Sequence, residues 1–398
     1  MRVLQVINAF YPPYSGGGAA HVAHNISKAL VGKGHEVTVY TTNALSRESL
    51  FDPKQNPYNE DGVEVFYFRN IIYKPQIHIY FSKEFVEAVK KSIAKYDTLH
   101  LHEYRSYISL VTSYYAKKYD VPYILQAHGQ LPRIMAKQRL KWIYDVLFGY
   151  RLLRDASKVI ALSRMEAEQY RGMDVPEEKI AIIPNGIYLS EYANLPPKGS
   201  FKKKFNIDKD EKIVLYLGRI HKSKGIDFLI KAYAHLTNDL KSRDALLVIA
   251  GPDDGHLGEA KSLVSALGVS DRVLFTGLLS EEEKINAYLD ASICTYLSPY
   301  EPFGLVPLEA AVCRTPVVVS SGTPMADIVD KGTFGLSAKY GDINKLAEIM
   351  GRMLNNDRFL REMGQRGRKF IFENFNWSKI VDKFGKLYEQ VAKEGRSA

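Results

Sequence analysis

The feature that most constrains the fold is a regular alternation of apolar strand patterns and amphipathic helix patterns along the whole chain. The first half alternates in this way from Val3 onward. The second half restarts the rhythm at Ile213 and ends in three helical patterns, near residues 342–355, 358–373 and 377–394. Such alternation is typical of parallel sheets covered by helices. We therefore expect an α/β protein with doubly wound sheets.

Chain length predicts two domains. The chain has 398 residues, more than one hydrophobic core usually covers, and Asn194–Ser200 is rich in proline and glycine. We expect a first domain at 1–195, a second at 200–375 and a C-terminal helix at 376–398. Ligands of such sheets bind beyond the carboxyl ends of the strands, so the expected site is a cleft between the domains.

Composition limits the cellular compartment and the kinds of binding partner that we expect for this protein. The formal net charge of +9 suggests anionic partners, whether nucleotides, phospholipid headgroups or nucleic acid. No run of 18 apolar residues occurs, and the N-terminus resembles a first strand rather than an export signal. Cys294 and Cys313 lie in apolar stretches and are expected to be buried thiols in a reducing compartment. We expect a cytoplasmic protein whose membrane contact, if present, is peripheral.

The segment Tyr296–Val319 carries the strongest chemical pattern. It predicts a strand, a loop with Glu301, a helix that begins near Gly304 and carries Glu309 in its second turn, and a Val-rich strand. Backbone N–H groups at the positive end of a helix stabilise a phosphate. The residues expected to supply them are Phe303, Gly304, Leu305 and Val306. The simpler alternative is an ordinary βαβ unit with two glutamates on a solvated helix face.

The string E-x-F-G-x-x-x-x-E from Glu301 to Glu309 resembles the signature of family 4 of the retaining glycosyltransferases. The resemblance implies the GT-B fold, in which two Rossmann-like domains face a cleft and the final helix packs back on the first domain. It also implies transfer of a sugar from a nucleoside diphosphate sugar, carrying uridine or guanosine, to an acceptor hydroxyl with retention of configuration. The acceptor would belong to polysaccharide or glycolipid synthesis. Front-side attack is the mechanism generally described for the family, with the departing phosphate oxygen taking the acceptor proton.

A second constellation is Y-L-G-R-I-H-K-S-K-G, at the end of the first strand of the second domain. Arg219 offers a planar fork to two phosphate oxygens, and Lys224 offers a mobile point charge. Isolated surface salt bridges are the alternative. The resemblance makes both residues ligands of the donor diphosphate, with Gly218 beside them in the cleft.

Three glycines, Gly16 to Gly18, follow the first strand and precede a helix. Their spacing differs from that of a dinucleotide-binding loop, and they either form a flexible turn or allow close approach of a ligand. The resemblance implies that Gly16 and Gly17 belong to the loop that closes over the donor phosphates.

Histidines stand at two predicted strand ends. His128 directly follows a strand, which places its imidazole at the rim of the expected cleft. A lone histidine is usually structural, but the resemblance places His128 near the reacting carbon of the donor sugar. We therefore assign His128 and Glu301 to catalysis. His100 and His102 form an H-x-H pair, for which we favour rim or core histidines over metal ligands.

The resemblance also implies roles for the remaining candidates. Glu309 is expected to bind the ribose hydroxyls, and the backbone at Gly277 and Leu278 to contact the base. Asn185 in P-N-G and Asp253 in A-G-P-D-D are expected near the cleft, although Asn185 also suits a structural turn.

No metal or other cofactor is expected. Asp208-Lys209-Asp210 lies in a polar stretch before a strand, which indicates a turn rather than the D-x-D site of metal-dependent transferases. Arg219 and Lys224 are expected to neutralise the leaving diphosphate.

Pro132–Arg154 predicts a basic amphipathic helix. Most such helices pack on their own core, but its aromatic and basic residues also suit an anionic lipid surface. This favours peripheral membrane contact and a lipid-linked acceptor. The predicted stripes are Arg133, Lys137 and Lys141 on one side and Leu140, Ile143, Tyr144 and Leu147 on the other.

Other functions remain open from the sequence alone. A nucleotide-sugar epimerase or a phosphorylase could use the same fold. A protein that only binds membranes or nucleic acid could exploit the positive charge. Because the basic residues are scattered and no base-stacking module is evident, we expect no nucleic-acid partner.

Overall fold

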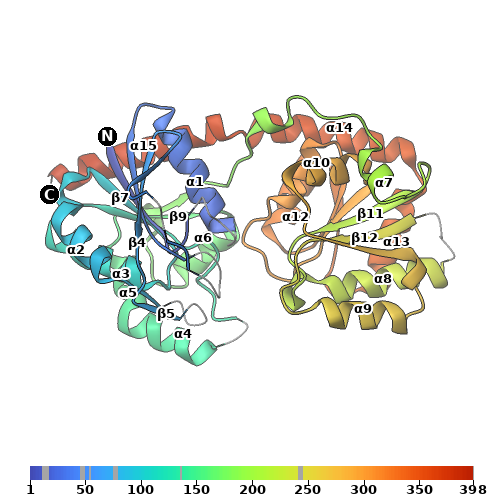
Figure 1. Cartoon of the computed structure of the whole chain (residues 1–398), viewed down its shortest axis with the longest axis horizontal. Coiled ribbons are helices and arrows are strands. Elements are labelled where there is room, and N and C mark those ends of the chain that lie inside the picture. Colours follow the sequence, from blue (N-terminus) through green and yellow to red (C-terminus); the bar gives the residue numbers. More distant parts are fainter. Residues whose placement is uncertain are drawn as a thin grey trace. The chain divides into compact units, whose positions relative to one another are not determined.

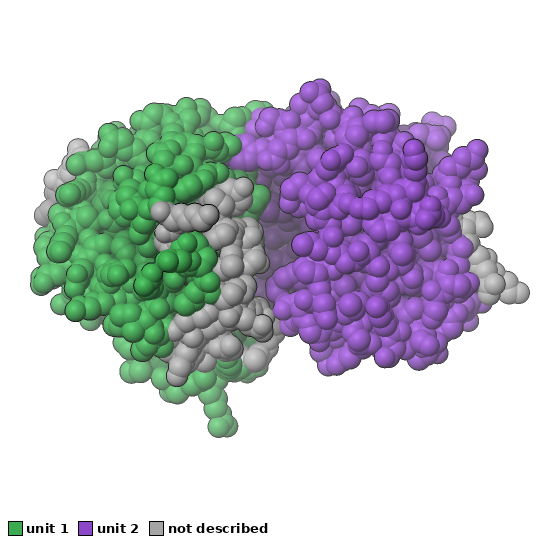
Figure 2. Space-filling model, viewed as in Figure 1, with its two compact units in different colours: residues 1–185, 377–398 green, residues 186–376 purple. Residues whose placement is uncertain are grey.

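The computed structural model describes residues 1–10, 18–44, 50–52, 55–74, 79–134, 137–240 and 245–397. The chain divides into two compact units, unit 1 with residues 1–185 and 377–398, and unit 2 with residues 186–376 (Figure 2). The boundary precedes the proline-rich segment Asn194–Ser200 that we expected to be the link. The reason is that Ile187 already pairs with the end of unit 2, where its N–H donates to the carbonyl of Phe375 at 2.8 Å.

Unit 1 begins with the N-terminal strand and ends with the C-terminal helix (Figure 1). Its strands are β1 (Arg2–Val6), β2 (Glu36–Thr42), β3 (Tyr58–Glu60), β4 (Val63–Phe68), β5 (Ile72–Lys74), β6 (Ile79–Phe81), β7 (Thr98–His102), β8 (Tyr123–Gln126), β9 (Lys158–Ala161) and β10 (Ile180–Ile182). Its α-helices are α1 (Gly18–Val31), α2 (Lys83–Ser92), α3 (Tyr107–Lys118), α4 (Gln138–Tyr144), α5 (Tyr150–Asp155), α6 (Arg164–Arg171) and α15 (Trp377–Ser397).

The main sheet of unit 1 has the strand order β10-β9-β8-β7-β1-β2-β4-β3 within the described residues. Only the short edge strand β3 pairs antiparallel in it, while β5 and β6 form a separate antiparallel pair. Every residue of β7 is buried, as expected for a parallel strand with both faces covered. The order reverses between β1 and β7, which marks the carboxyl ends of these strands as the ligand-binding edge of the sheet.

Unit 2 has a six-stranded parallel sheet within the described residues, in the order β13-β12-β11-β14-β15-β16. The strands are β11 (Lys212–Leu217), β12 (Ala245–Ala250), β13 (Val273–Gly277), β14 (Ile293–Tyr296), β15 (Val317–Ser320) and β16 (Gly335–Ala338). The helices are α7 (Ser200–Lys204), α8 (Ile226–Asn238), α9 (Leu257–Ala266), α10 (Glu281–Asp290), α11 (Val306–Val312), α12 (Pro324–Gly332), α13 (Ile343–Leu354) and α14 (Asp357–Asn374).

Helices cover both faces of the unit 2 sheet (Figure 1). One face packs on α8, α9 and α13, and alternate residues such as Val214 and Tyr216 of β11 belong to this buried cluster. The strand order reverses between β11 and β14, so the loops after these two strands lie at the switch point. The expected doubly wound α/β architecture is confirmed in each unit.

Helix α15 packs on unit 1. The hydroxyl of Tyr388 lies 2.6 Å from Nδ1 of His100 on β7, and Lys33 pairs with Asp382 at 2.8 Å. The ring of Phe384 is fully buried. Among the described helices, none combines the length and the apolar character needed to cross a membrane.

Candidate functional site

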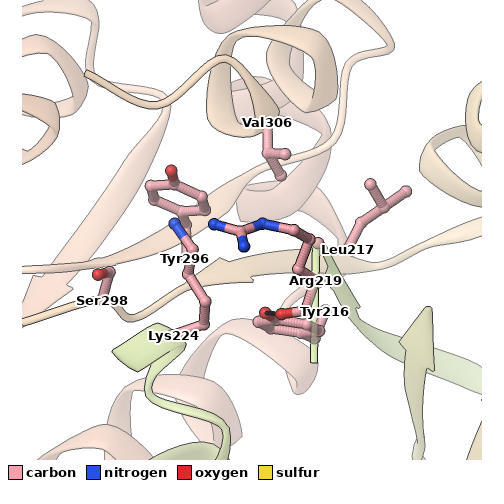
Figure 3. A pocket seen from close by; sticks show the side chains of 8 residues that line it. Tyr216, Leu217, Arg219, Lys224, Tyr296, Ser298 and Val306 are labelled. Atoms are coloured by element: carbon pink, nitrogen blue, oxygen red, sulfur yellow. Dashed lines mark hydrogen bonds between the residues drawn. The ribbon is translucent and has the colours of Figure 1, made fainter. Parts of the chain in front are cut away.

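The loops after β11 and β14 form a small cavity in unit 2. Its volume is about 140 Å³. Figure 3 shows Arg219 and Lys224 pointing into the same space, with Tyr296 and Val306 beside them. The cavity therefore brings the two predicted cations together at the switch point. Its lining residues are Tyr216, Leu217, Gly218, Arg219, Lys224, Tyr296, Ser298 and Val306.

The loop that carries both cations is fixed by its ends. A short 3₁₀ turn at Lys222–Lys224 follows His221, whose Nδ1 accepts the backbone N–H of Ser223 at 3.2 Å. Gly225 then adopts a φ of +73°, and a Cβ there would lie 2.1 Å from the carbonyl oxygen of Leu297. Only glycine fits this position, where the loop passes directly against the chain after β14.

Each cation has a carboxylate partner in the free protein. Nζ of Lys224 lies 2.6 Å from Oε2 of Glu301, and the two side chains are only 22% and 15% exposed. Arg219 forms an ion pair with Asp254, in the loop after β12. The predicted catalytic glutamate therefore contacts a predicted diphosphate ligand directly.

Tyr296 links the two glutamates of the motif. Burial raises the pKa of its hydroxyl well above the ordinary value, and the charges of Glu301, with its hydrogen bond, and of Glu309 raise it further. The chain runs close over this ring, because a Cβ at Gly304 would lie 2.5 Å from it. Both carboxylates thus raise the pKa of the same phenol.

Helix α11 begins at Val306, two residues later than we expected. Pro307 suits the first turn because its φ is already helical, but it lacks an N–H. Phe303 and Gly304 are buried in the loop before the helix, so of the four predicted donors only Leu305 and Val306 lie at the helix end. Glu309 consequently lies in the first turn of α11 and not in the second.

Glu309 is held from the opposite side by α10. The buried Tyr288 hydroxyl donates to Oε2 of Glu309 at 2.7 Å. Burial, followed by the charge of Glu309, raises the pKa of Tyr288 well above its usual value. This contact fixes the carboxylate while leaving its second oxygen for another donor.

The other nucleotide-side candidates have different surroundings. Oδ1 of Asp253 accepts backbone N–H groups from Gly255, His256 and Leu257 at 2.9–3.1 Å, which lowers the pKa of this carboxyl. Asp253 therefore closes the turn before α9, and its neighbour Asp254 contacts Arg219 instead. Gly277 ends β13, and Leu278 after it is 75% exposed.

Unit 1 carries the remaining candidates. His128 follows β8 with a left-handed φ of +51°, and its Nε2 lies 2.9 Å from Nδ1 of His102. Asn185 is 5% exposed and is the last residue of the first of the two chain segments that form this unit. Gly16 and Gly17 lie outside the described residues.

The residues considered as metal ligands have structural surroundings. His100 and His102 are fully buried core residues. The N–H of Asp210 donates to Oδ1 of Asp208 at 2.8 Å, so this pair forms the turn that we inferred. Among the described residues, no cluster of three or more histidine, cysteine or acidic side chains is arranged to hold a metal ion.

Of the amphipathic helix predicted at 132–154, the structure has a continuous helical segment only from Gln138 onward. The structure has α4, a π-helical turn at Asp145–Gly149, and α5. Arg133 lies before α4 and pairs with buried Asp145 at 2.8 Å, while Nζ of Lys141 donates to the carbonyl of Ile134. The basic stripe is therefore absent from the described segment, because two of its members serve local contacts and Lys137 adopts a left-handed conformation at the cap of α4.

Sequence reasoning assigned no role to Asp254 or Tyr296 and did not predict the contact of His102 with His128. Asp254 lies in A-G-P-D-D and Tyr296 begins the segment Tyr296–Val319, so both are close in sequence to residues that we named as candidates. This closeness was the only indication in the sequence that they belong to the site. The contact of His102 with His128 follows from β7 and β8 being neighbours, which the sequence does not state.

Comparisons with known proteins cover nearly the whole chain. Residues 16–191 match the family described as Glycosyltransferase Family 4, and residues 197–370 match Glycosyl transferases group 1. The chain is 28% identical over 390 residues to an uncharacterized glycosyltransferase from Methanocaldococcus jannaschii, covering 95% of this chain and 96% of that one. It is 25% identical over 403 residues to N-acetyl-alpha-D-glucosaminyl L-malate synthase from Bacillus anthracis, covering 97% of each.

Solved structures share the fold. Sucrose-phosphate synthase from Thermosynechococcus elongatus superposes with a TM-score of 0.79 at 24% identity, over 98% of both chains. HepE from Anabaena, in complex with UDP and glucose, superposes with a TM-score of 0.75 at 18% identity, over 98% of this chain and 100% of HepE. These likenesses confirm the GT-B fold.

Proposed function

Because this chain belongs to the family 4 glycosyltransferases with the GT-B fold, we propose that it moves a sugar from a nucleoside diphosphate sugar to an acceptor hydroxyl with retention of configuration. Glycosyl transfer itself follows from the family. The donor, the stereochemistry and the acceptor are our proposals. The observation that carries them is the cavity at the switch point of unit 2, into which Arg219 and Lys224 both point.

The two cations suit the two phosphates of a donor. Arg219 can hold phosphate oxygens with two N–H groups, and Lys224 can follow the charge that develops on the leaving group. Both already make ion pairs in the free protein, so an arriving diphosphate must share or replace Glu301 and Asp254. We propose this exchange of partners as the first step of donor binding.

The acids then take separate roles. Glu301, next to Lys224 and Tyr296, would flank the sugar together with His128. Glu309, anchored by Tyr288, would accept hydrogen bonds from the ribose hydroxyls. Retention by front-side attack asks the enzyme mainly to position both substrates and to stabilise the departing diphosphate, which takes the acceptor proton.

We further propose that no metal ion is needed. Arg219 and Lys224 together supply two positive charges at the leaving group, the task that a divalent ion performs in other transferases. Addition of EDTA should therefore leave turnover unchanged. A loss of activity that Mg²⁺ or Mn²⁺ restores would contradict this proposal.

Relatives suggest the donor base. HepE is described in complexes with UDP and with UDP-glucose, which favours a uridine nucleotide over the guanosine alternative. Incubating the protein with UDP-glucose, UDP-N-acetylglucosamine and GDP-mannose, and measuring slow release of nucleotide, tests this choice. Release from none of the three would count against the donor proposal.

A pair of neighbouring lysines gives a matched control for the site. Lys224→Ala should abolish most of the turnover, because one of the two charges on the diphosphate is lost. Lys222→Ala removes an exposed lysine from the same 3₁₀ turn and should have little effect. Similar losses in both variants would indicate a general electrostatic effect and not a diphosphate ligand.

Rival functions give different products. A labelled donor incubated with an acceptor yields a new glycoside for a transferase, an epimerised nucleotide sugar for an epimerase, and a sugar phosphate for a phosphorylase. A protein that only binds nucleic acid would be stabilised against heat by RNA but not by UDP, GDP or ADP.

An exposed apolar surface supports a lipid-linked acceptor. Six side chains of α4 and the following π-helical turn are 44–62% exposed, and no residue of α4 is buried. Asp145 points inward and forms ion pairs of 2.8 Å with Arg105 and Arg133, which hold the segment on unit 1. The apolar side chains of the same segment remain exposed. The six residues, which we call the apolar surface, are Leu140, Trp142, Ile143, Val146, Leu147 and Phe148.

We propose that the apolar surface rests on the inner face of an anionic membrane and brings the enzyme to a glycolipid acceptor. Exposed Arg139 and Arg151 nearby suit acidic headgroups. The protein should sediment with phosphatidylglycerol vesicles at low salt. Leu147→Glu should prevent this, whereas Leu240→Glu, at an exposed leucine of unit 2, should not. Failure of the wild-type protein to sediment would refute membrane contact, and equal loss in both variants would refute this surface.

A further inference from the structure

A buried row of side chains connects the interior of unit 1 with His128. His102, the last residue of β7, is fully buried and lies between two polar groups. Its Nε2 is 2.7 Å from Oε1 of Gln5 on β1, and its Nδ1 is 2.9 Å from Nε2 of His128. The rings of His102 and His128 are inclined by only 13°, and their centroids lie 5.2 Å apart.

The direction of these hydrogen bonds can be derived from the end of the row. The atom of Gln5 that faces His102 is the amide oxygen, which only accepts, so in this arrangement Nε2 of His102 carries a proton and donates it. In a neutral imidazole the other nitrogen is then an acceptor, so Nδ1 of His102 receives the N–H of His128 from Nε2. The same rule leaves Nδ1 of His128 without a proton.

Burial keeps both rings neutral. It lowers the pKa of His128 to about 3, and it lowers that of His102 well below the usual value, with further contributions from His100 and His128. Each ring therefore holds a single proton near neutral pH. The tautomer is consequently decided by the hydrogen-bond partners.

The backbone at His128 is also held in place. Its left-handed φ of +51° is unfavourable for a residue with a Cβ, by about 1–2 kcal/mol. The next N–H, that of Gly129, donates to Oε1 of buried Glu166 at 2.6 Å, while Oε2 of Glu166 accepts the N–H of Leu162. Strain of this kind persists where surrounding contacts enforce it, and it is common at functional sites.

We infer that His102 is a positioning residue, which fixes His128 in the tautomer protonated at Nε2 so that Nδ1 can accept a hydrogen bond from a substrate hydroxyl. Nδ1 of His128 forms no hydrogen bond with any of the described residues. The part of the inference that concerns a hydroxyl rests on the proposed function. The part that concerns the tautomer does not.

Two variants of similar size separate this role from simple packing. In His102→Asn the amide oxygen occupies the place of Nδ1 and can still accept from His128. In His102→Gln the amide reaches the place of Nε2, so the contact with Gln5 is kept and the one with His128 is lost. We expect His102→Asn to keep kcat within about threefold, and His102→Gln to lower kcat by about 10- to 100-fold at little changed KM for the donor, the usual range for partners that orient a working histidine.

The tautomer can be measured without substrate. Nitrogen-15 NMR of histidine-labelled protein should show a protonated Nε2 and an unprotonated Nδ1 for His128 in the wild type and in His102→Asn. Thermal unfolding of both variants monitors folding, since a purely structural role predicts equal losses or a better-preserved His102→Gln. Either that pattern or a proton on Nδ1 of His128 in the wild type would overturn the inference. A protein with the expected tautomer but without donor turnover would instead contradict the proposed function.

Discussion

Glu301→Gln is the substitution that best tests the site in unit 2. Glutamine keeps the size and hydrogen-bonding capacity of the side chain but removes the negative charge that forms an ion pair with Lys224. We expect turnover to fall by about 100-fold or more, the scale found when a preorganised polar contact to a transition state is lost. We expect the affinity for UDP to rise, because Lys224 becomes available to the diphosphate.

The size of this gain follows from the ion pair. At 2.6 Å the attraction between two unit charges is about 1.6 kcal/mol at the dielectric constant of water. Exposed ion pairs usually contribute about 0.2–1 kcal/mol, and the side chains of Lys224 and Glu301, at 22% and 15% exposure, are more shielded than most. We therefore take about 1 kcal/mol, which corresponds to about fivefold tighter binding of UDP.

Calorimetry with UDP and steady-state kinetics with the preferred donor measure the two effects separately. Glu348→Gln is a matched control, because Glu348 pairs with Lys345 on α13 outside the cavity. It should change neither quantity. Parallel losses of turnover and UDP affinity in Glu301→Gln would refute the catalytic assignment, and unchanged affinity would refute the exchange of partners at Lys224.

Three further predictions concern the scaffold. Gly225→Ala should lower the melting temperature by several degrees through its clash with the carbonyl of Leu297, whereas Gly268→Ala, also at a positive φ but in open space, should cost less. Asp145→Ala should lower the free energy of unfolding by about 3–5 kcal/mol, since Arg105 and Arg133 lose the buried carboxylate with which they pair. Burial raises the pKa of Glu166 to about 7, above its unfolded value, so its contribution to stability should decline as pH rises from about 4.5 to 7, and Glu166→Gln should reduce this dependence in pH-resolved denaturation curves.

Much of the fold was predictable because its information is local and periodic. The helical pattern at 358–373 predicts α14 to within one residue at each end. It was also predictable that Arg219 and Val306 would lie at the same edge of the sheet. Both follow strands of one parallel sheet, and the carboxyl ends of such strands meet at one edge.

The pairing of side chains was not predictable, because it depends on strand order and loop geometry. The sequence places Asp253 and Asp254 side by side, but only the turn before α9 decides that one closes this turn and the other contacts Arg219. Similarly, Asp145 lies in a helical pattern, yet its buried contacts with two distant arginines accompany a π-helical turn. Contacts between residues far apart in the chain produce no periodic pattern in the sequence from which they could be predicted.

The ion pairs of Arg219 and Lys224 affect which ligands the cavity can bind. Both cations already contact a carboxylate, so a ligand gains affinity only to the extent that it outcompetes these partners. A monophosphate can engage one cation fully, whereas a diphosphate has oxygens for both and can exchange both partners in one binding event. These two ion pairs thereby discriminate against ligands with a single phosphate, and a nucleoside diphosphate should bind much more tightly than its monophosphate even though the base and ribose are the same.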